Sequence, residues 1–116
     1  AKARWGESEA YRESTRREAK RTDADRDAIQ RESEDIFRAF AALIGESPSD
    51  ARVQSLVRRW QSFITERYYP CTNEILAGLG LMYVRDERFQ SNIDSFGAGT
   101  AKLMGDAIAI YCGGTD

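Results

Sequence analysis

Two successive helix signals lie within residues 68–96, YYPCTNEILAGLGLMYVRDERFQSNIDSF. Pro70 disfavours helical geometry at the residue before it, so an earlier helix should end there. Thr72 can then cap a new helix, because its hydroxyl can accept a hydrogen bond from a backbone N–H of the first turn. Asp86 can cap a shorter helix in the same way, running to about residue 93. The apolar positions of the longer helix recur at helical spacing: Ile75, Leu76, Leu79, Met82 and Tyr83.

The chain before this segment shows the same helical periodicity. Residues 10–20 are polar and have almost no apolar stripe, so a helix there should be marginal by itself. Thr22 with Asp25 predicts the start of a second helix, which Gly45 would end. Ser47 and Pro48 predict the start of a third helix, since proline is tolerated at the first helical position. The apolar faces of these two helices are Ile29, Ile36, Phe37, Phe40 and Ile44, with Ser33 among them, and Val53, Leu56, Val57, Trp60, Ile64 and Tyr68.

The chain after residue 96 predicts one more helix. Residues 97–99, Gly-Ala-Gly, indicate a loop, and residues 113–114, Gly-Gly, indicate the end of the helix that follows. Its apolar face is Ala101, Met104, Ala107, Ile108 and Tyr111. No two-residue alternation typical of strands is present in the sequence. The fold class is therefore all-α.

Composition limits the functions that are compatible with this chain. The 116 residues suit a single domain over residues 1–116, and a net charge of −2 argues against a nucleic-acid surface within it. No apolar run approaches the ~20 residues that span a bilayer. We expect no membrane contact, a cytoplasmic protein and, without an initiator Met, a fragment of a longer chain. Histidine is absent, which removes the usual zinc ligands and the proximal haem ligand, so we expect no metal and no cofactor.

Small residues interrupt the apolar helix at Ala77, Gly78 and Gly80. Glycine costs ~1 kcal/mol relative to alanine inside a helix, so two glycines within three positions require an explanation. Either two helices pack closely there, or a ligand lies directly against the backbone. The sequence leaves both explanations open.

Aromatic side chains are distributed over four of the predicted helical segments. A stripe of aromatic residues is usually core, and we favour that interpretation for Trp60 and Phe89. Tyrosine needs a partner for its hydroxyl when buried, so five tyrosines in a domain of this size suggest that some face a groove. The aromatic set is Trp60, Phe63, Tyr68, Tyr69, Tyr83, Phe89, Phe96 and Tyr111.

Cys71 and Cys112 are the only cysteines. Their separation permits a disulfide, but we expect two reduced thiols. Cys71 precedes a predicted helix N-terminus, which can lower a thiol pKa, whereas nearby Glu74 opposes that effect. It is either a reactive, ligand-capturing thiol or an inert, half-buried cysteine, and we favour the second. Asp86 and Glu87 do not form a catalytic carboxylate pair, because neighbours on a helix do not face each other.

Three segments together resemble one known family. They are RWGESEAYRES at residues 4–14, WQSFITERYYPCTNEILAGLGLMYVRDERF at residues 60–89 and NIDSFGAGTAKLMGDAIAIYC at residues 92–112. The combination resembles the TipAS antibiotic-recognition domain, the C-terminal effector domain of one branch of the MerR-family transcriptional regulators. The resemblance covers nearly the whole chain.

This resemblance implies a globin-like helical effector domain without haem, of about five to six helices. It implies that DNA is bound only through a winged helix-turn-helix absent from this chain, and that the full-length protein is a homodimer through a coiled coil. This fragment alone would be monomeric. The expected partner is a hydrophobic small-molecule effector, such as a thiopeptide or another bulky, largely apolar compound. Binding would control transcription or, in members made as the effector domain alone, sequester the compound.

The resemblance also implies a lid and one departure from the family. Residues 1–21 would be an N-terminal lid that orders on ligand capture, over a helical core at residues 22–116. Thiopeptide-trapping members carry a reactive cysteine at the position of Gly78, whereas Cys71 matches an earlier cysteine that many relatives keep. We therefore expect reversible binding rather than covalent capture.

The resulting hypothesis is an effector-binding domain and not an enzyme. We expect the third, fourth and last helices to form a ligand cleft. The ligand-binding candidates are Trp5, Tyr11, Trp60, Phe63, Tyr69, Cys71, Gly78, Met82, Tyr83 and Phe89. Two alternatives are a helical protein-interaction module, whose groove takes a partner helix, and a thiol-based sensor at Cys71.

Overall fold

The computed structural model describes residues 12–114, among which there are helices and no β-strand. Residues 12–19 form a short helix ahead of the longer ones. The elements that follow are α2 (Asp23–Ala41), α3 (Ala51–Arg67), α4 (Asn73–Arg85), α5 (Glu87–Asp94), α6 (Thr100–Ala109) and a π-helical turn, η1 (Ile110–Gly114). The all-α prediction is confirmed. None of the helices in this part of the chain has the length and apolar character needed to cross a membrane.

Three predicted caps are present, and each satisfies a backbone N–H that has no partner within its helix. Thr22 begins α2 with a reciprocal pair, in which Asp25 N donates to Thr22 Oγ1 at 3.1 Å and Thr22 N donates to Asp25 Oδ2 at 3.0 Å. Thr72 Oγ1 accepts from Ile75 N at 3.2 Å to begin α4. Asp86 caps α5. Local sequence therefore determined where these three helices start.

Two predicted boundaries are wrong. The third helix begins at Ala51 rather than Pro48, because Asp50 supplies the cap by accepting from Arg52 N at 2.8 Å. Ser47 is instead part of a turn in which its Oγ accepts from Ser49 N. The second helix ends at Ala41, before Ile44, whose side chain is 40% exposed instead of lying on the buried face.

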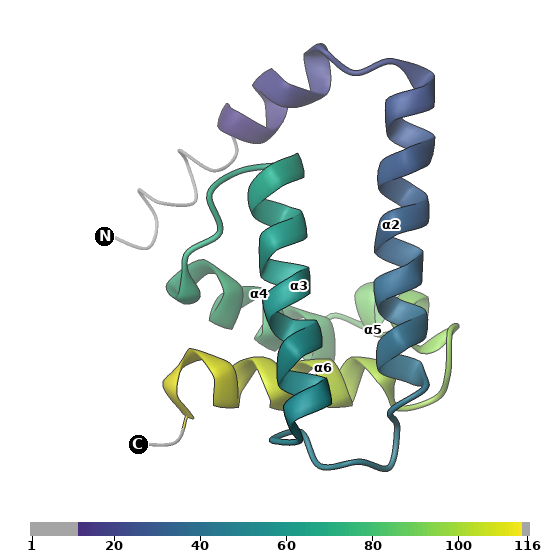
Figure 1. The fold of residues 1–116 in the computed structure, drawn as a ribbon, viewed down its shortest axis with the longest axis vertical. Coiled ribbons are helices and arrows are strands. Elements are labelled where there is room, and N and C mark those ends of the chain that lie inside the picture. Colours follow the sequence, from purple (N-terminus) through teal and green to yellow (C-terminus); the bar gives the residue numbers. More distant parts are fainter. Residues whose placement is uncertain (1–11, 115–116) are drawn as a thin grey trace.

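Figure 1 shows α2 and α3 running beside each other, with α6 crossing behind their lower ends and α4 and α5 also behind. The core forms where these helices meet. Its fully buried large side chains come from α2, α3, α4, α5 and α6: Ile36, Phe40, Val53, Val57, Leu76, Ile93, Met104 and Ile108. Apart from Ile93 of α5, these residues lie on the apolar faces that the sequence pattern predicted for their helices.

The contact between α4 and α6 depends on two glycines. A Cβ atom added at Gly80 would lie 2.9 Å from Ile108 Cγ2, and one added at Gly105 would lie 2.8 Å from Val84 Cγ1. Both distances are shorter than real side chains tolerate, so the two helices approach as closely as they do only because neither residue has a side chain. Close helix packing is therefore the explanation for Gly80.

Candidate functional site

An apolar cleft of about 320 Å³ lies between α2, α3, α4 and α5. Ser33 and Asn92 are polar, and most of the other residues are aromatic or aliphatic. The lining is Ser33 and Phe37 from α2, Trp60, Phe63 and Ile64 from α3, Tyr68 and Tyr69 after it, Leu79, Met82 and Tyr83 from α4, and Phe89, Asn92 and Ile93 from α5. We refer to it below as the aromatic cleft.

Trp60 is the centre of the aromatic cleft. Its ring stacks on Phe63 with centroids 5.3 Å apart, and it packs against Phe37 at 5.0 Å. Its Nε1 donates a hydrogen bond to the Tyr83 hydroxyl at 3.2 Å, which satisfies two buried polar groups at once. Trp60 is only 6% exposed, so it forms a rigid floor of the aromatic cleft. This burial agrees with the interpretation of Trp60 as a core residue.

Phe89 forms part of the rim. Its ring lies 6.2 Å from that of Tyr83, yet its side chain is 38% exposed, so the interpretation of Phe89 as core is wrong. It follows the Asp86 cap in the first turn of α5, and the short helix leaves it at the cleft edge. Because the ring is already exposed beside an apolar hollow, it can contact a ligand directly, whereas a ring buried in the core would first have to move out.

Burial raises the pKa of the tyrosines of the cleft further above the physiological range. It raises the pKa of Tyr83 above its usual value, and the hydrogen bond from Trp60 only partly opposes this. Burial also raises the pKa of Tyr69. Both groups are therefore neutral phenols at physiological pH, able to donate or accept a hydrogen bond but unsuited to act as bases.

The structure brings six of the candidates together in this cleft: Trp60, Phe63, Tyr69, Met82, Tyr83 and Phe89. The expectation that the last helix lines the ligand cleft is wrong. The apolar face of α6, including Met104 and Ile108, is buried in the core. Helices α2 and α5 take its place in the wall. The sequence had placed Ser33 and Phe37 on one face of α2, so a signal for them existed. Trp5 and Tyr11 lie outside the described residues.

Gly78 and Cys71 do not line the aromatic cleft. Gly78 is exposed, and a Cβ there would meet nothing within 4 Å, so neither close packing nor cleft shape accounts for this glycine. Cys71 is buried, and its backbone N–H donates to Thr65 Oγ1 at 3.1 Å. Burial raises the pKa of its thiol to about 11, with a further contribution from Cys112. No group of residues suited to hold a metal ion occurs between residues 12 and 114.

Two further hollows of about 340 and 350 Å³ lie near the start of α2. They equal the aromatic cleft in size, but arginines and carboxylates form much of their walls. A site for an apolar compound needs apolar walls with few polar groups, which only the aromatic cleft offers among these three hollows.

Comparison with known proteins agrees with this geometry. The family model for the TipAS antibiotic-recognition domain matches residues 1–111. The chain belongs to this family. It is 39% identical over 84 residues to the HTH-type transcriptional activator mta of Bacillus subtilis (strain 168), covering 72% of this chain and 33% of that protein. It is 38% identical over 107 residues to the HTH-type transcriptional activator TipA of Streptomyces coelicolor, covering 90% of this chain and 42% of TipA. The chain thus spans less than half the length of these curated relatives.

Two solved structures share the fold. One is TipAS from Streptomyces lividans in complex with nosiheptide, with a TM-score of 0.85 and 37% identity over 94% of this chain and 78% of that one. The other is the antibiotic-binding domain of a TipA-class multidrug resistance transcriptional regulator, with a TM-score of 0.67 and 36% identity over 72% of this chain and 92% of that one. These likenesses support the assignment to the TipAS family at the level of both sequence and fold.

The raised pKa of Cys71 leads to a test of covalent chemistry in this TipAS-family chain. Only the thiolate attacks electrophiles, so Cys71 in the folded protein should react with iodoacetamide at pH 8 at least about tenfold more slowly than in the unfolded chain. Its rate should keep rising with pH until about 11, beyond the ordinary thiol value of 9.0. Mass spectrometry of a Cys112→Ser variant, with and without denaturant, measures this. Equal rates in the two states would contradict the burial argument.

Proposed function

We propose that the aromatic cleft reversibly binds bulky, largely apolar antibiotic-like compounds of the thiopeptide or multidrug type. The observation that carries the proposal is the convergence of Trp60, Tyr83 and Phe89, with Met82 beside them, around an apolar hollow. Its volume of about 320 Å³ lies at the lower end of the ~300–1,000 Å³ range of small-molecule sites. Membership of the TipAS family and the nosiheptide complex of a 37% identical relative support the same ligand class.

Binding without catalysis suits the chemistry of the cleft. Its titratable side chains are tyrosines, and burial raises the pKa of Tyr68, Tyr69 and Tyr83. Among residues 12–114, the lining contains no activated nucleophile and no base poised near neutral pH. The thiol-sensor alternative is disfavoured by the burial and raised pKa of Cys71. The protein-interaction alternative is disfavoured because the side chains of residues 12–114 leave the hollow open.

Where the domain is part of a longer regulator, the bound compound would control transcription. Relatives more than twice the length of this chain are named HTH-type transcriptional activators. We place DNA binding and dimerisation in a part of such a protein that is not in this chain, and the whole in the cytoplasm. Where only the effector domain is made, it would sequester the compound.

Residues 1–21 would act as the lid of the cleft. The helix at residues 12–19 is already tied to the end of α3, where Arg17 Nη1 donates to the Thr65 carbonyl at 2.7 Å. Thr65 lies three residues before Tyr68, which lines the cleft. Ligand binding should therefore slow amide exchange in residues 12–20 more than in the largely exposed segment 45–49, which lines none of these hollows.

A titration of the protein with nosiheptide and a panel of hydrophobic cations and dyes tests the proposal. Trp60 forms the floor of the cleft, so an occupying ligand should change tryptophan fluorescence. Calorimetry provides a second readout that does not depend on the fluorophore. Flat signals in both measurements across the panel would refute the proposed function.

Truncation of the rim should weaken binding while leaving the fold intact. Phe89→Ala is expected to raise the dissociation constant for a bound panel compound about tenfold, because an aromatic contact is lost from a partly exposed position. The matched control is Leu81→Ala on the neighbouring helix, which removes a 51% exposed side chain outside the cleft and should leave affinity unchanged. Equal effects of the two substitutions would place the ligand elsewhere.

A further inference from the structure

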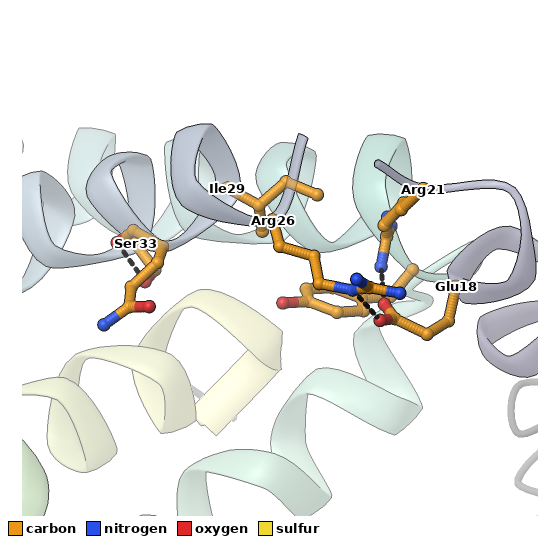
Figure 2. Close-up of a pocket in the computed structure, with 7 residues that line it drawn as sticks. Glu18, Arg21, Arg26, Ile29 and Ser33 are labelled. Carbon is orange, nitrogen blue, oxygen red and sulfur yellow. Dashed lines mark hydrogen bonds and ion pairs between the residues drawn. The ribbon is translucent and has the colours of Figure 1, made fainter. Parts of the chain in front are cut away.

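A second hollow adjoins the aromatic cleft. It has a volume of about 340 Å³ and lies between the helix at residues 12–19, the first half of α2 and Tyr68. Figure 2 shows Glu18, Arg21 and Arg26 gathered at one end of it, with Ser33 at the other. Ser33 and Tyr68 line both this hollow and the aromatic cleft, so the two spaces share a wall. We refer to the second space as the arginine hollow.

Tyr68 is the boundary between the apolar and the charged space. Its ring meets Phe63 edge to face, with centroids 6.0 Å apart, on the side of the aromatic cleft. The Arg21 guanidinium lies 5.0 Å from the centroid of the same ring. A single side chain therefore contacts the aromatic network and a cation at once. A compound lying over Tyr68 would have an apolar surface on one side and guanidinium groups on the other.

The charges in the arginine hollow leave hydrogen-bond donors in excess. Glu18 Oε1 accepts from Arg26 Nε at 2.7 Å, and Glu18 Oε2 accepts from Arg21 Nη1 at 2.9 Å. These hydrogen bonds hold the pKa of Glu18 below its usual value, so the group is a carboxylate. Arg26 Nη1 also donates to Asp23 Oδ1 at 3.0 Å, outside the lining, so the two guanidiniums are paired with two carboxylates in all. Each guanidinium carries five N–H donors, of which these bonds use one in Arg21 and two in Arg26. Gln30 adds an amide group to the same wall.

We propose that the arginine hollow is a second ligand subsite, which takes a carboxylate or amide-carbonyl arm of a compound whose aromatic body occupies the aromatic cleft. This inference rests on the proposed function, and it narrows the ligand class to elongated aromatic compounds with a hydrogen-bond-accepting arm. Arginine suits such an arm, because its planar donors form charge-assisted hydrogen bonds with carboxylates and, more weakly, donate to carbonyl oxygens. Arg26 is the residue best placed to do so, since it is half exposed and its second partner, Asp23, is almost fully exposed to water. It can therefore turn towards a ligand while Arg21 still holds Glu18.

A pair of fluorescent probes tests the subsite. Dansylamide and dansylglycine share one aromatic body, and only dansylglycine carries a carboxylate arm. The emission of the dansyl group rises in an apolar site, so both affinities are measured in the same way. Dansylglycine is expected to bind at least about tenfold more tightly than dansylamide at low salt. The ratio should fall as NaCl is raised from about 0.05 to about 0.5 M, because salt screens a half-exposed ion pair.

Arg26→Gln should remove most of this preference by weakening dansylglycine and leaving dansylamide unchanged. The matched control is Arg31→Gln, which removes the same charge from an exposed position of α2 that lines neither hollow and should preserve the ratio. Equal binding of both probes to the unaltered protein would overturn the subsite while leaving the proposed function standing. An equal loss of preference in the two variants would also overturn it, because the cause would then be overall charge. If neither probe nor any panel compound binds, both the subsite and the proposed function are wrong.

Discussion

Phe40→Ala is expected to lower the free energy of unfolding by about 3–5 kcal/mol, because it removes a large aromatic side chain and leaves a cavity. Phe40 is fully buried near the C-terminal end of α2, where that helix meets α3 and α6. The surrounding helices cannot collapse into the space, because closely packed neighbours hold them apart. A domain of this size has a total stability of ~5–15 kcal/mol, so the loss is a large fraction of it.

Urea unfolding followed by circular dichroism measures this loss. Leu81→Ala serves as the control, because the leucine is 51% exposed and its truncation should change stability by less than about 1 kcal/mol. A change of similar size in the two variants would mean that the α2 contact is not part of the cooperative core.

The second large effect is expected from adding a single methyl group between α4 and α6. Gly105→Ala should destabilise the domain by about 1–3 kcal/mol, since overpacking a tight contact forces backbone or side-chain shifts. The new Cβ would lie 2.8 Å from Val84 Cγ1 and 3.2 Å from the Gly80 carbonyl oxygen. The valine could rotate, but the backbone oxygen can move only if the helix moves with it. This cost outweighs the ~1 kcal/mol that alanine contributes over glycine as a helix former.

Gly78→Ala is the matched control and should have the opposite sign. It is also a helical glycine, but a Cβ there meets nothing within 4 Å, so only the helix propensity changes. A stabilisation of about 1 kcal/mol is expected, seen as a higher Tm in thermal unfolding. If both substitutions stabilise the domain, the close approach of α4 and α6 is not required for the fold.

Helix boundaries were predictable wherever a short-range signal decided them. Thr22, Thr72 and Asp86 cap as predicted, because each cap is a bond between neighbours in the sequence. Pro48 misled for the same reason, because a competing cap at Asp50 lies only two residues away and formed the better turn. Ile44 was misplaced because periodicity alone does not show where a helix stops.

The ligand candidates were predictable as a group but not as a site. Aromatic residues such as Trp60, Tyr83 and Phe89 were identified from residue type, and the structure brings them together. That Trp60 forms the floor of the cleft and Phe89 its rim depends on the packing of α5 against α4, which no local sequence pattern encodes. The same holds for the two glycines in α4, since only the position of α6 distinguishes Gly80, which packs against Ile108, from Gly78, where an added Cβ would meet nothing within 4 Å.

The amino-acid order alone determined an all-helical chain, three of its caps, most of its apolar faces and its family, because these depend on residue type and near-neighbour spacing. Tertiary structure alone decided which faces meet, so that α2 and α5 complete the aromatic cleft while α6 lies in the core. The burial of Cys71, and with it the raised pKa of its thiol, was decided in the same way. The physical reason is that burial results from contacts between distant segments of the chain. The exclusion of water by those contacts decides the pKa of a cysteine thiol and whether an aromatic ring can reach a ligand.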